Sequence, residues 1–177
     1  MLKTFYFNPY RECTYVLIDD AKHAMVIDAG MYEVREQERF AEYIQKEQLE
    51  VVALLVTHAH PDHVCGVEFM ETTYDLKAIV HPAEGQLDIP FFNIQVIATP
   101  GHKEDCVCYY LPEEKILFTG DTLFQESIGR TDLPGGDMGT LIHSLNKLVV
   151  LPDDTQVYPG HGYPTTIGHE KQYNPYI

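Results

Sequence analysis

Three histidines and an aspartate fall within six consecutive positions of the chain. They are His58, His60, Asp62 and His63. Neutral imidazole nitrogens and carboxylate oxygens are common protein ligands for zinc and iron. The segment follows directly after the apolar run Leu54–Val56, which predicts a buried strand. We therefore predict a metal site in a loop at the end of this strand, in preference to a solvated loop with incidental histidines.

Three further candidate ligands follow downstream, each in a glycine-containing turn after an apolar or aromatic run. They are His102, Asp121 and His161. Ligands at the ends of several strands can be held by a rigid sheet while the loops shape a cleft around them. Seven candidate ligands exceed what one tetrahedral ion uses. We therefore expect two divalent ions that share a carboxylate and a hydroxide, although the sequence leaves open whether one or two are bound.

The order of these residues resembles that of the metallo-β-lactamase-fold superfamily, in which a His-x-His-x-Asp-His loop precedes a single His, a bridging Asp and a final His. The resemblance implies a first metal site at His58, His60 and His102, a second at Asp62, His63 and His161, and a bridge at Asp121. It also implies an α/β fold of the α+β kind, the αβ/βα four-layer sandwich, with the metals at one edge.

Two stretches resemble the short bacterial glyoxalase II-like hydrolases of this superfamily. These are Phe118–Phe124 with Ser127–Asp132, and Tyr158–Gly162. The best-known β-lactamase subgroup has a cysteine at the position of Asp121, and flavodiiron proteins have a glutamate at that of His60, so neither class is favoured. The resemblance implies a metal-dependent hydrolase of thioesters such as 2-hydroxyacyl-glutathione-like compounds, which uses a metal-bridging hydroxide oriented by Asp62. A thiolate leaves without much acid assistance, which suits a site with no evident general acid.

Two alternatives remain at this stage. The stretches Thr99–His102 and Gly129–Asp132 are also similar to persulfide dioxygenases of the same superfamily, in which His58, His102 and Asp121 would hold one iron as a two-His, one-carboxylate triad. A non-catalytic, metal-stabilised binding domain is the other alternative, and the complete ligand set argues against it. We expect zinc, with iron or manganese as the other choices.

Three residues outside the ligand set are candidates for supporting roles. Asp28, in Val26–Gly30, is the candidate acceptor for the second N–H of a ligating imidazole, although a capping role would also explain it. Arg130 and Lys103 are candidate anchors for a substrate carboxylate, although each could equally be a solvated surface charge.

The composition indicates one domain, 1–177, because this length fits a single core and 45% of the residues are hydrophobic. The net charge of −15 disfavours nucleic acid and anionic membranes as partners. No segment is apolar for long enough to span a membrane, and the chain opens without a leader pattern. We therefore expect a cytoplasmic enzyme with a small-molecule thioester substrate. The oligomeric state stays open.

Four cysteines are expected to be reduced thiols, and the roles of Cys65, Cys106 and Cys108 stay open. The periodicity predicts an amphipathic helix over 33–48 and a second helix that begins near Gly66. Strands are expected near 4–8, 13–18, 24–27, 51–56, 78–80, 92–98, 107–111 and 116–118, with a last strand over 155–158. Asp137 is the expected N-cap of a further helix.

Overall fold

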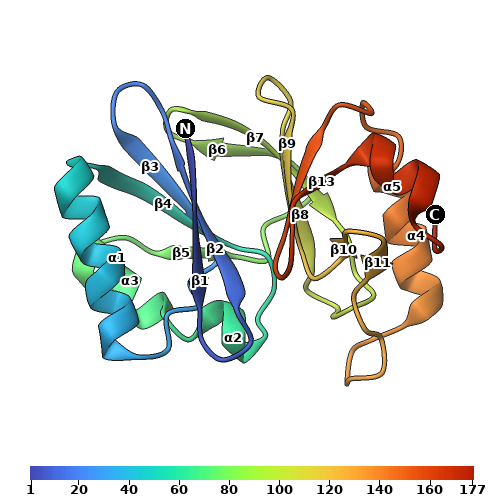
Figure 1. Ribbon diagram of the computed structural model, residues 1–177, viewed down its shortest axis with the longest axis horizontal. Helices are drawn as coiled ribbons and strands as arrows, with labels where there is room; N and C mark the ends of the chain where they lie inside the picture. Colours follow the sequence, from blue (N-terminus) through green and yellow to red (C-terminus); the bar gives the residue numbers. More distant parts are fainter. The chain divides into compact units, whose positions relative to one another are not determined.

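The computed structural model describes residues 1–177. The chain forms two compact units, Met1–Val80 and His81–Ile177. In Figure 1 the first unit runs from blue to green and the second from green to red. Each unit combines a β-sheet with helices, which confirms the predicted mixed α/β class.

The first unit is built on a five-stranded sheet with the order β1-β2-β3-β4-β5. Its strands are β1 (Leu2–Phe7), β2 (Glu12–Ile18), β3 (His23–Ile27), β4 (Glu50–Val56) and β5 (Ala78–Val80). β1, β2 and β3 pair antiparallel, whereas β3, β4 and β5 pair parallel. Because β3 and β4 are parallel, Asp28 and the histidine-rich segment leave the sheet at the same edge.

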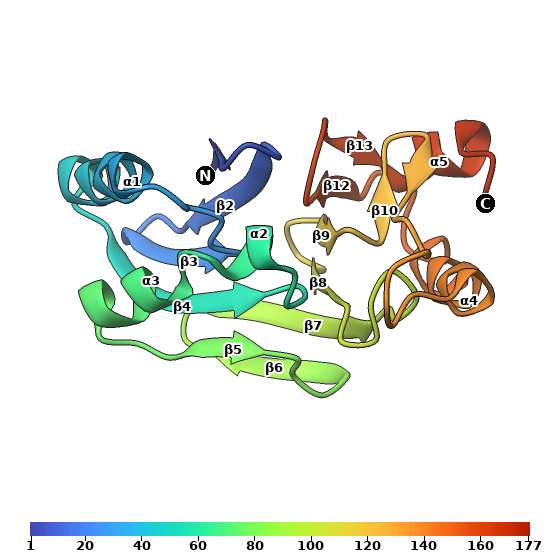
Figure 2. The same ribbon diagram turned by 90° about the horizontal axis from the view of Figure 1, so that it is seen from below.

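Three helices complete the first unit: α1 (Val34–Glu47), α2 (Pro61–Val64) and α3 (Val67–Tyr74). α1 begins at a capping box between Glu33 and Glu36, which satisfies N–H groups that the helix itself cannot. α1 and α3 lie on the same side of the sheet (Figure 2) and bury Phe40 and Met70 in its apolar core. The helix predicted over 33–48 is confirmed.

The second unit is built on a six-stranded sheet with the order β13-β12-β9-β8-β7-β6. Its strands are β6 (Gly85–Ile89), β7 (Phe92–Ala98), β8 (Val107–Leu111), β9 (Ile116–Gly120), β12 (Gln156–Pro159) and β13 (Thr165–Thr166). β10 (Leu123–Phe124) and β11 (Ser127–Ile128) form a separate pair.

Strand direction in this sheet explains where three of the predicted ligands lie. β8 is antiparallel to both β7 and β9, and β12 is parallel to β9. β7, β9 and β12 therefore run the same way, and their carboxyl ends share one edge. His102, Asp121 and His161 all follow those ends, as the positions of their turns in the sequence predict.

α4 (Met138–Leu148) and α5 (Ile167–Tyr173) pack on one side of this sheet, where Leu145 and Ile167 join its apolar core. The side chain of Asp137 accepts a hydrogen bond of 2.7 Å from Thr140 N, which confirms the predicted N-cap of α4. The strand expected over 155–158 is β12. The prediction that it is the last strand was wrong, because β13 and α5 follow it.

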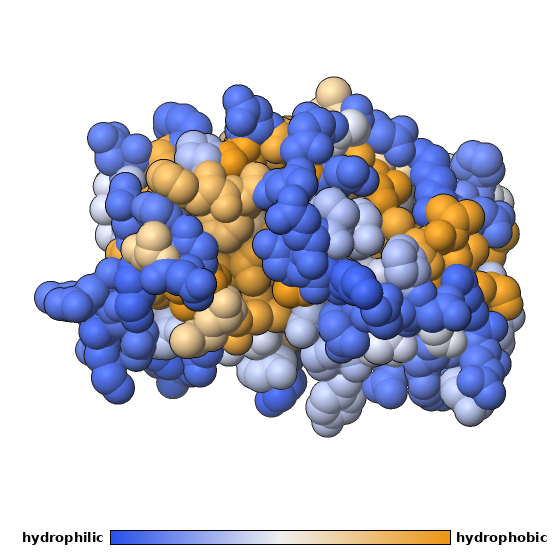
Figure 3. Space-filling model, turned by 90° about the horizontal axis from the view of Figure 1, so that it is seen from above, coloured by the Kyte–Doolittle hydropathy of each residue, from blue (hydrophilic) through white to orange (hydrophobic).

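All four cysteines are free thiols, as expected; Cys13, Cys106 and Cys108 are buried and Cys65 is half-buried. Burial raises the pKa of Cys108 to about 12 and also raises that of Cys106. Both thiols are therefore protonated and inert at neutral pH. Hydrophilic residues make up much of the face shown in Figure 3, with hydrophobic side chains between them. None of the five helices has the length and apolar character needed to cross a bilayer.

Candidate metal centre

The first unit gathers four of the predicted ligands at the end of β4. The segment is not entirely a loop, because Asp62 and His63 lie in the short helix α2 and His60 is its N-cap. His58 Nε2 lies 3.0 Å from His60 Nδ1, and the His58 and His63 rings are 4.2 Å apart. His63 Nε2 lies 3.9 Å from Asp62 Oδ2. The chain turn after one strand thus brings three imidazoles and a carboxylate together.

The Asp28 side chain accepts hydrogen bonds from two residues of this segment, Thr57 and His63. Its Oδ1 accepts from Thr57 N at 2.7 Å, and its Oδ2 accepts from Thr57 Oγ1 and from His63 Nδ1, both at 2.8 Å. Asp28 has a left-handed backbone, with φ 59°. A proton held on His63 Nδ1 by this carboxylate leaves the Nε2 lone pair available to a cation. The contact is the one that the sequence predicted for Asp28 if His63 is a ligand.

Glu12 lies next to this network and was not among the predicted site residues. It is fully buried; Thr14 Oγ1 donates to its Oε2 at 2.9 Å, and its Oε1 has no hydrogen-bond partner. Side-chain donor atoms of Glu12, Asp28 and His63 all lie within 4.8 Å of one another. Burial raises the pKa of Glu12 well above its ordinary value. A carboxylate at a strand start is normally solvated, so the sequence carried no signal for this position.

The second unit places one carboxylate between two imidazoles. Asp121 Oδ2 lies 3.6 Å from His102 Nε2, and Asp121 Oδ1 lies 3.7 Å from His161 Nε2. These separations are too long for hydrogen bonds. They fit two ligands of one ion, because ligand atoms about 2.0–2.2 Å from a tetrahedral zinc are roughly 3.4 Å from each other. The donor set therefore suits a divalent cation.

Backbone contacts support predicted ligands of the second unit. His102 Nδ1 donates to the carbonyl oxygen of Arg130 at 2.8 Å. A Cβ on Gly129 would lie 1.9 Å from the carbonyl oxygen of Asp121 and 3.0 Å from His102 Cβ. Only glycine permits this close approach, so the turn that carries Asp121 and the chain that supports His102 can touch.

The two predicted substrate anchors are both paired with neighbouring aspartates. Arg130 forms a two-pronged pair with Asp132, with Nε and Nη2 each 2.7 Å from a carboxylate oxygen. This hydrogen bonding lowers the pKa of Asp132 to about 2. Lys103 Nζ lies 2.7 Å from Asp105 Oδ1. An incoming carboxylate would have to compete with these partners, and the anchoring role stays a prediction.

Known sequences and structures identify the family. Residues 9–93 and 86–161 match the family profile described as Metallo-beta-lactamase superfamily. The chain is 36% identical to Hydroxyacylglutathione hydrolase GloC of Haemophilus influenzae over 90% of this chain and 89% of that protein.

Three solved structures resemble the whole chain. BLEG-1 B3 metallo-beta-lactamase superposes with a TM-score of 0.94 at 35% identity, covering 99% of both chains. ETHE1 from Myxococcus xanthus gives 0.89 at 29% identity, with 99% of this chain and 83% of that chain covered. TTHA1623 in a di-iron-bound form gives 0.88 at 32% identity, with 99% and 100% covered. These matches agree with the predicted fold, and the chain belongs to the metallo-β-lactamase superfamily.

Proposed function

We propose that this protein hydrolyses small thioesters with a metal-activated hydroxide, and that 2-hydroxyacyl thioesters of glutathione or a similar thiol are its substrate class. The observation that carries the proposal is the Asp121 carboxylate, set 3.6 and 3.7 Å from two imidazoles at a shared strand edge. The similarity to a protein named as a hydroxyacylglutathione hydrolase supports the substrate class.

Seven side chains would hold two divalent cations, zinc by preference and iron or manganese as alternatives. Following the family pattern, the first set is His58, His60 and His102, the second is Asp62, His63 and His161, and Asp121 serves both. Two such cations, when bound, supply hydroxide at neutral pH and polarise a carbonyl group. A solved relative titled as a di-iron-bound form agrees with two ions per chain.

The residues of the chain position the reacting groups. Asp62 would accept a hydrogen bond from the hydroxide that the bound cations supply, and so direct an oxygen lone pair of that hydroxide at the thioester carbon. Asp28 keeps the proton of His63 on Nδ1 through its 2.8 Å contact. A C–O bond forms at the carbonyl carbon, the C–S bond breaks, and the thiolate departs with the bonding electron pair. Its low basicity removes the need for a protein acid.

Several finer assignments belong to this proposal. Arg130 would anchor a substrate carboxylate after exchanging Asp132 for it, and Lys103 would do the same with Asp105. The two units would act as one catalytic domain over 1–177, in the cytoplasm, with neither nucleic acid nor membrane as a partner.

A mononuclear iron persulfide dioxygenase is the second candidate. The stretches Thr99–His102 and Gly129–Asp132 favour this candidate. The similarity to ETHE1 is the reason to test it beside the hydrolase. Here His58, His102 and Asp121 would hold the iron, and His63 and His161 would be dispensable.

One protein preparation, stripped of metal and reloaded separately with Zn²⁺ and Fe²⁺, distinguishes these chemistries. We expect the zinc form to release thiol from 2-hydroxyacyl glutathione thioesters, and His63→Ala and His161→Ala to abolish this release. Oxygen uptake with glutathione persulfide by the iron form, retained in both variants, would replace the hydrolase with the dioxygenase. A β-lactam belongs in the substrate panel because of the BLEG-1 likeness; its faster turnover would move the substrate class to cyclic amides.

A further inference from the structure

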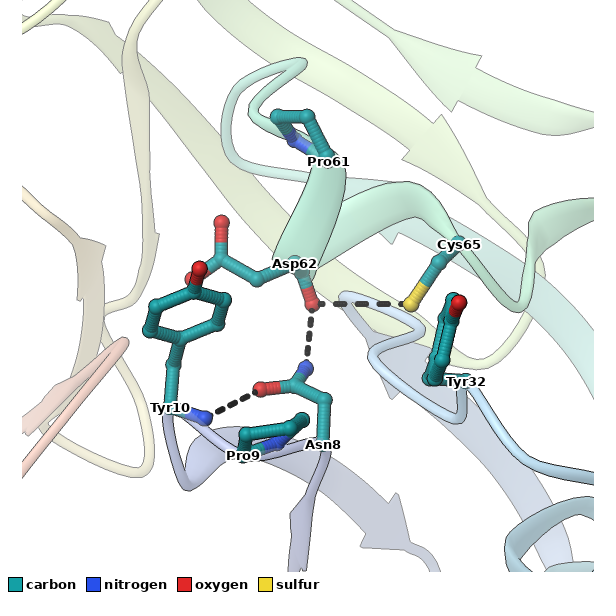
Figure 4. Close-up of a pocket in the computed structure, with 7 residues that line it drawn as sticks. All are labelled: Asn8, Pro9, Tyr10, Tyr32, Pro61, Asp62 and Cys65. Atoms are coloured by element: carbon teal, nitrogen blue, oxygen red, sulfur yellow. Dashed lines mark hydrogen bonds between the residues drawn. The ribbon is translucent and has the colours of Figure 1, made fainter.

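We propose that a pocket within the first unit binds an uncharged, apolar substituent on the acyl group of the substrate. The pocket is lined by Asn8, Pro9, Tyr10, Tyr32, Pro61, Asp62 and Cys65, and Figure 4 shows these side chains. We call it the Tyr10–Tyr32 pocket. The inference rests on the proposed hydrolase function, because it names the part of a thioester that this pocket recognises.

The polar groups at the floor of the pocket are already used within the protein. Asn8 Nδ2 donates to the carbonyl oxygens of Gly30 and Asp62 at 3.0 and 2.9 Å, and Asn8 Oδ1 accepts from Tyr10 N at 3.0 Å. Cys65 Sγ donates to Gly30 O at 3.2 Å. A ligand therefore meets mainly carbon and sulfur surface, which favours an uncharged, apolar group.

Two exposed aromatic residues form opposite walls of the pocket. The side chain of Tyr10 is 74% exposed and that of Tyr32 is 68% exposed. In Figure 4 the Tyr10 ring lies beside the Asp62 carboxylate and the Tyr32 ring lies beside Cys65. Pro9 and Pro61 stiffen the backbone on either side. Two exposed rings around a cavity with rigid walls provide apolar contact area for a ligand at little cost in ordering.

The size of the pocket suits one substituent better than a whole substrate. Its volume is about 320 Å³, at the lower end of the range of about 300–1,000 Å³ that is usual for small-molecule sites. Apolar cavities of about 150 Å³ already hold benzene. A phenyl ring or a branched alkyl chain would therefore fit, with room for the carbon that joins it to the carbonyl group.

The position of Asp62 indicates which end of the substrate enters. Asp62 lines the pocket, and in the proposed mechanism it contacts the hydroxide that attacks the carbonyl carbon. The carbon that carries the acyl substituent is bonded to that same carbonyl carbon, so the substituent lies close to Asp62. A thiol carrier such as glutathione brings carboxylates, which an apolar pocket beside an aspartate would repel. The pocket therefore selects among acyl groups.

Two thioesters of one thiol test the assignment: 2-hydroxypropanoyl, with a methyl substituent, and 2-hydroxy-2-phenylacetyl, with a phenyl substituent. We expect the zinc-loaded protein to prefer the phenyl substrate in kcat/KM. Tyr32→Ala should reduce the phenyl-to-methyl ratio of kcat/KM by about tenfold, since lost apolar contact of this size changes discrimination by about 10–200-fold. Tyr32→Phe should restore the ratio. Tyr176→Ala is the control, because it removes an exposed tyrosine outside the pocket.

A binding measurement separates failure of the pocket from failure of the function. Uncharged 2-phenylacetamide, titrated into protein with labelled tyrosine rings, should shift the Tyr10 and Tyr32 signals in the wild type and bind more weakly to Tyr32→Ala. If thioesters are hydrolysed but the substrate ratio is unchanged in Tyr32→Ala, the pocket assignment is wrong and the hydrolase stands. If no thioester is hydrolysed, the function is wrong. The pocket then survives only if the amide binds and Tyr32→Ala weakens it.

Discussion

The two units support their imidazoles in different ways. In the first unit, His63 Nδ1 donates to the Asp28 side chain, which also binds Thr57. In the second, His102 Nδ1 donates to a backbone carbonyl, that of Arg130. A carboxylate acceptor makes the imidazole a more basic ligand than a neutral carbonyl does. Support for His63 thus depends on the identity of one side chain, and support for His102 depends on the path of the backbone.

The two units also differ in where their predicted ligands lie in the sequence. The first unit takes four from one contiguous turn after β4, whereas the second takes three from separate turns after β7, β9 and β12. Substitutions at neighbouring positions can change the geometry of the ligands in a contiguous turn. Ligands on three strands are fixed by the register of the sheet, which a point substitution seldom changes.

The largest effect should come from Asp121, which lies between the imidazoles of His102 and His161. We expect Asp121→Ala to lower metal content and to reduce the rate of thioester hydrolysis by more than about 100-fold, beyond the 10–100-fold typical of a residue that only supports a ligand. Elemental analysis and steady-state kinetics measure both. His143→Ala, at an exposed position of α4, is the control, and equal losses in the two variants would refute the ligand assignment.

A smaller effect, from Asp28→Asn, tests the difference in support directly. Asparagine tolerates the left-handed backbone at this position, so the fold should persist. With its oxygen facing Thr57 N, its NH₂ group would face His63 Nδ1 and favour the tautomer with the proton on Nε2. We expect metal affinity to fall about 10–100-fold, measured by competition with a chromophoric chelator.

Arg130→Ala is the matched variant in the second unit, because it keeps the carbonyl that His102 contacts. Metal affinity should stay within about twofold of the wild type. A loss as large as that of Asp28→Asn would mean that the two units do not differ in the way described.

The smallest effect concerns the buried carboxyls. Glu170 in the second unit accepts from Thr165 Oγ1, Asn174 Nδ2 and Glu126 N, whereas Glu12 in the first has an unpartnered oxygen. Because burial raises the pKa of Glu12 above its ordinary 4.5, the folded state holds its proton more tightly than the unfolded state. Stability should therefore fall as pH rises from about 4.5 towards the folded pKa, by at most about 1.4 kcal/mol per pH unit.

Glu12→Gln should remove this dependence, so the metal-free variant should gain stability over the wild type between pH 5 and pH 8. Urea unfolding at the two pH values measures the difference. Glu170→Gln should instead destabilise the chain at both pH values, since one of its acceptors becomes a donor. Parallel pH curves for Glu12→Gln and the wild type would contradict the argument.

Much of the fold could be predicted where periodicity or chemistry was strong. β7 has the predicted bounds, because buried and exposed residues alternate along it, and Asp137 capped its helix as expected. β6, with the sequence GQLDI, mostly exposed, carries no such alternation. α5 is short and polar and was missed. Tertiary packing determines both β6 and α5, and no local sequence pattern predicts either element.

The residues of the candidate site were likewise predictable only in part. The spacing of the histidines and aspartates was enough to select candidate ligands, and the turn Val26–Gly30 was enough to select Asp28 as a candidate support. Glu12 could not be found, because its environment depends on Gly30, where a Cβ would lie 1.9 Å from Glu12 Oε2. The sequence spacing also did not predict the pairing of Arg130 with Asp132, although the two residues are close in sequence.

Asp28 combines a left-handed backbone with three accepted hydrogen bonds. Asparagine would tolerate the backbone but lack the second acceptor oxygen, and glycine would tolerate it but lack both. Glutamate would supply both oxygens, but it disfavours the left-handed backbone. Each single substitution thus fails for a different reason. In terms of sequence variation, none of these substitutions at position 28 is neutral. Evolutionary change in the proposed metal binding of the first unit therefore has to begin at other positions.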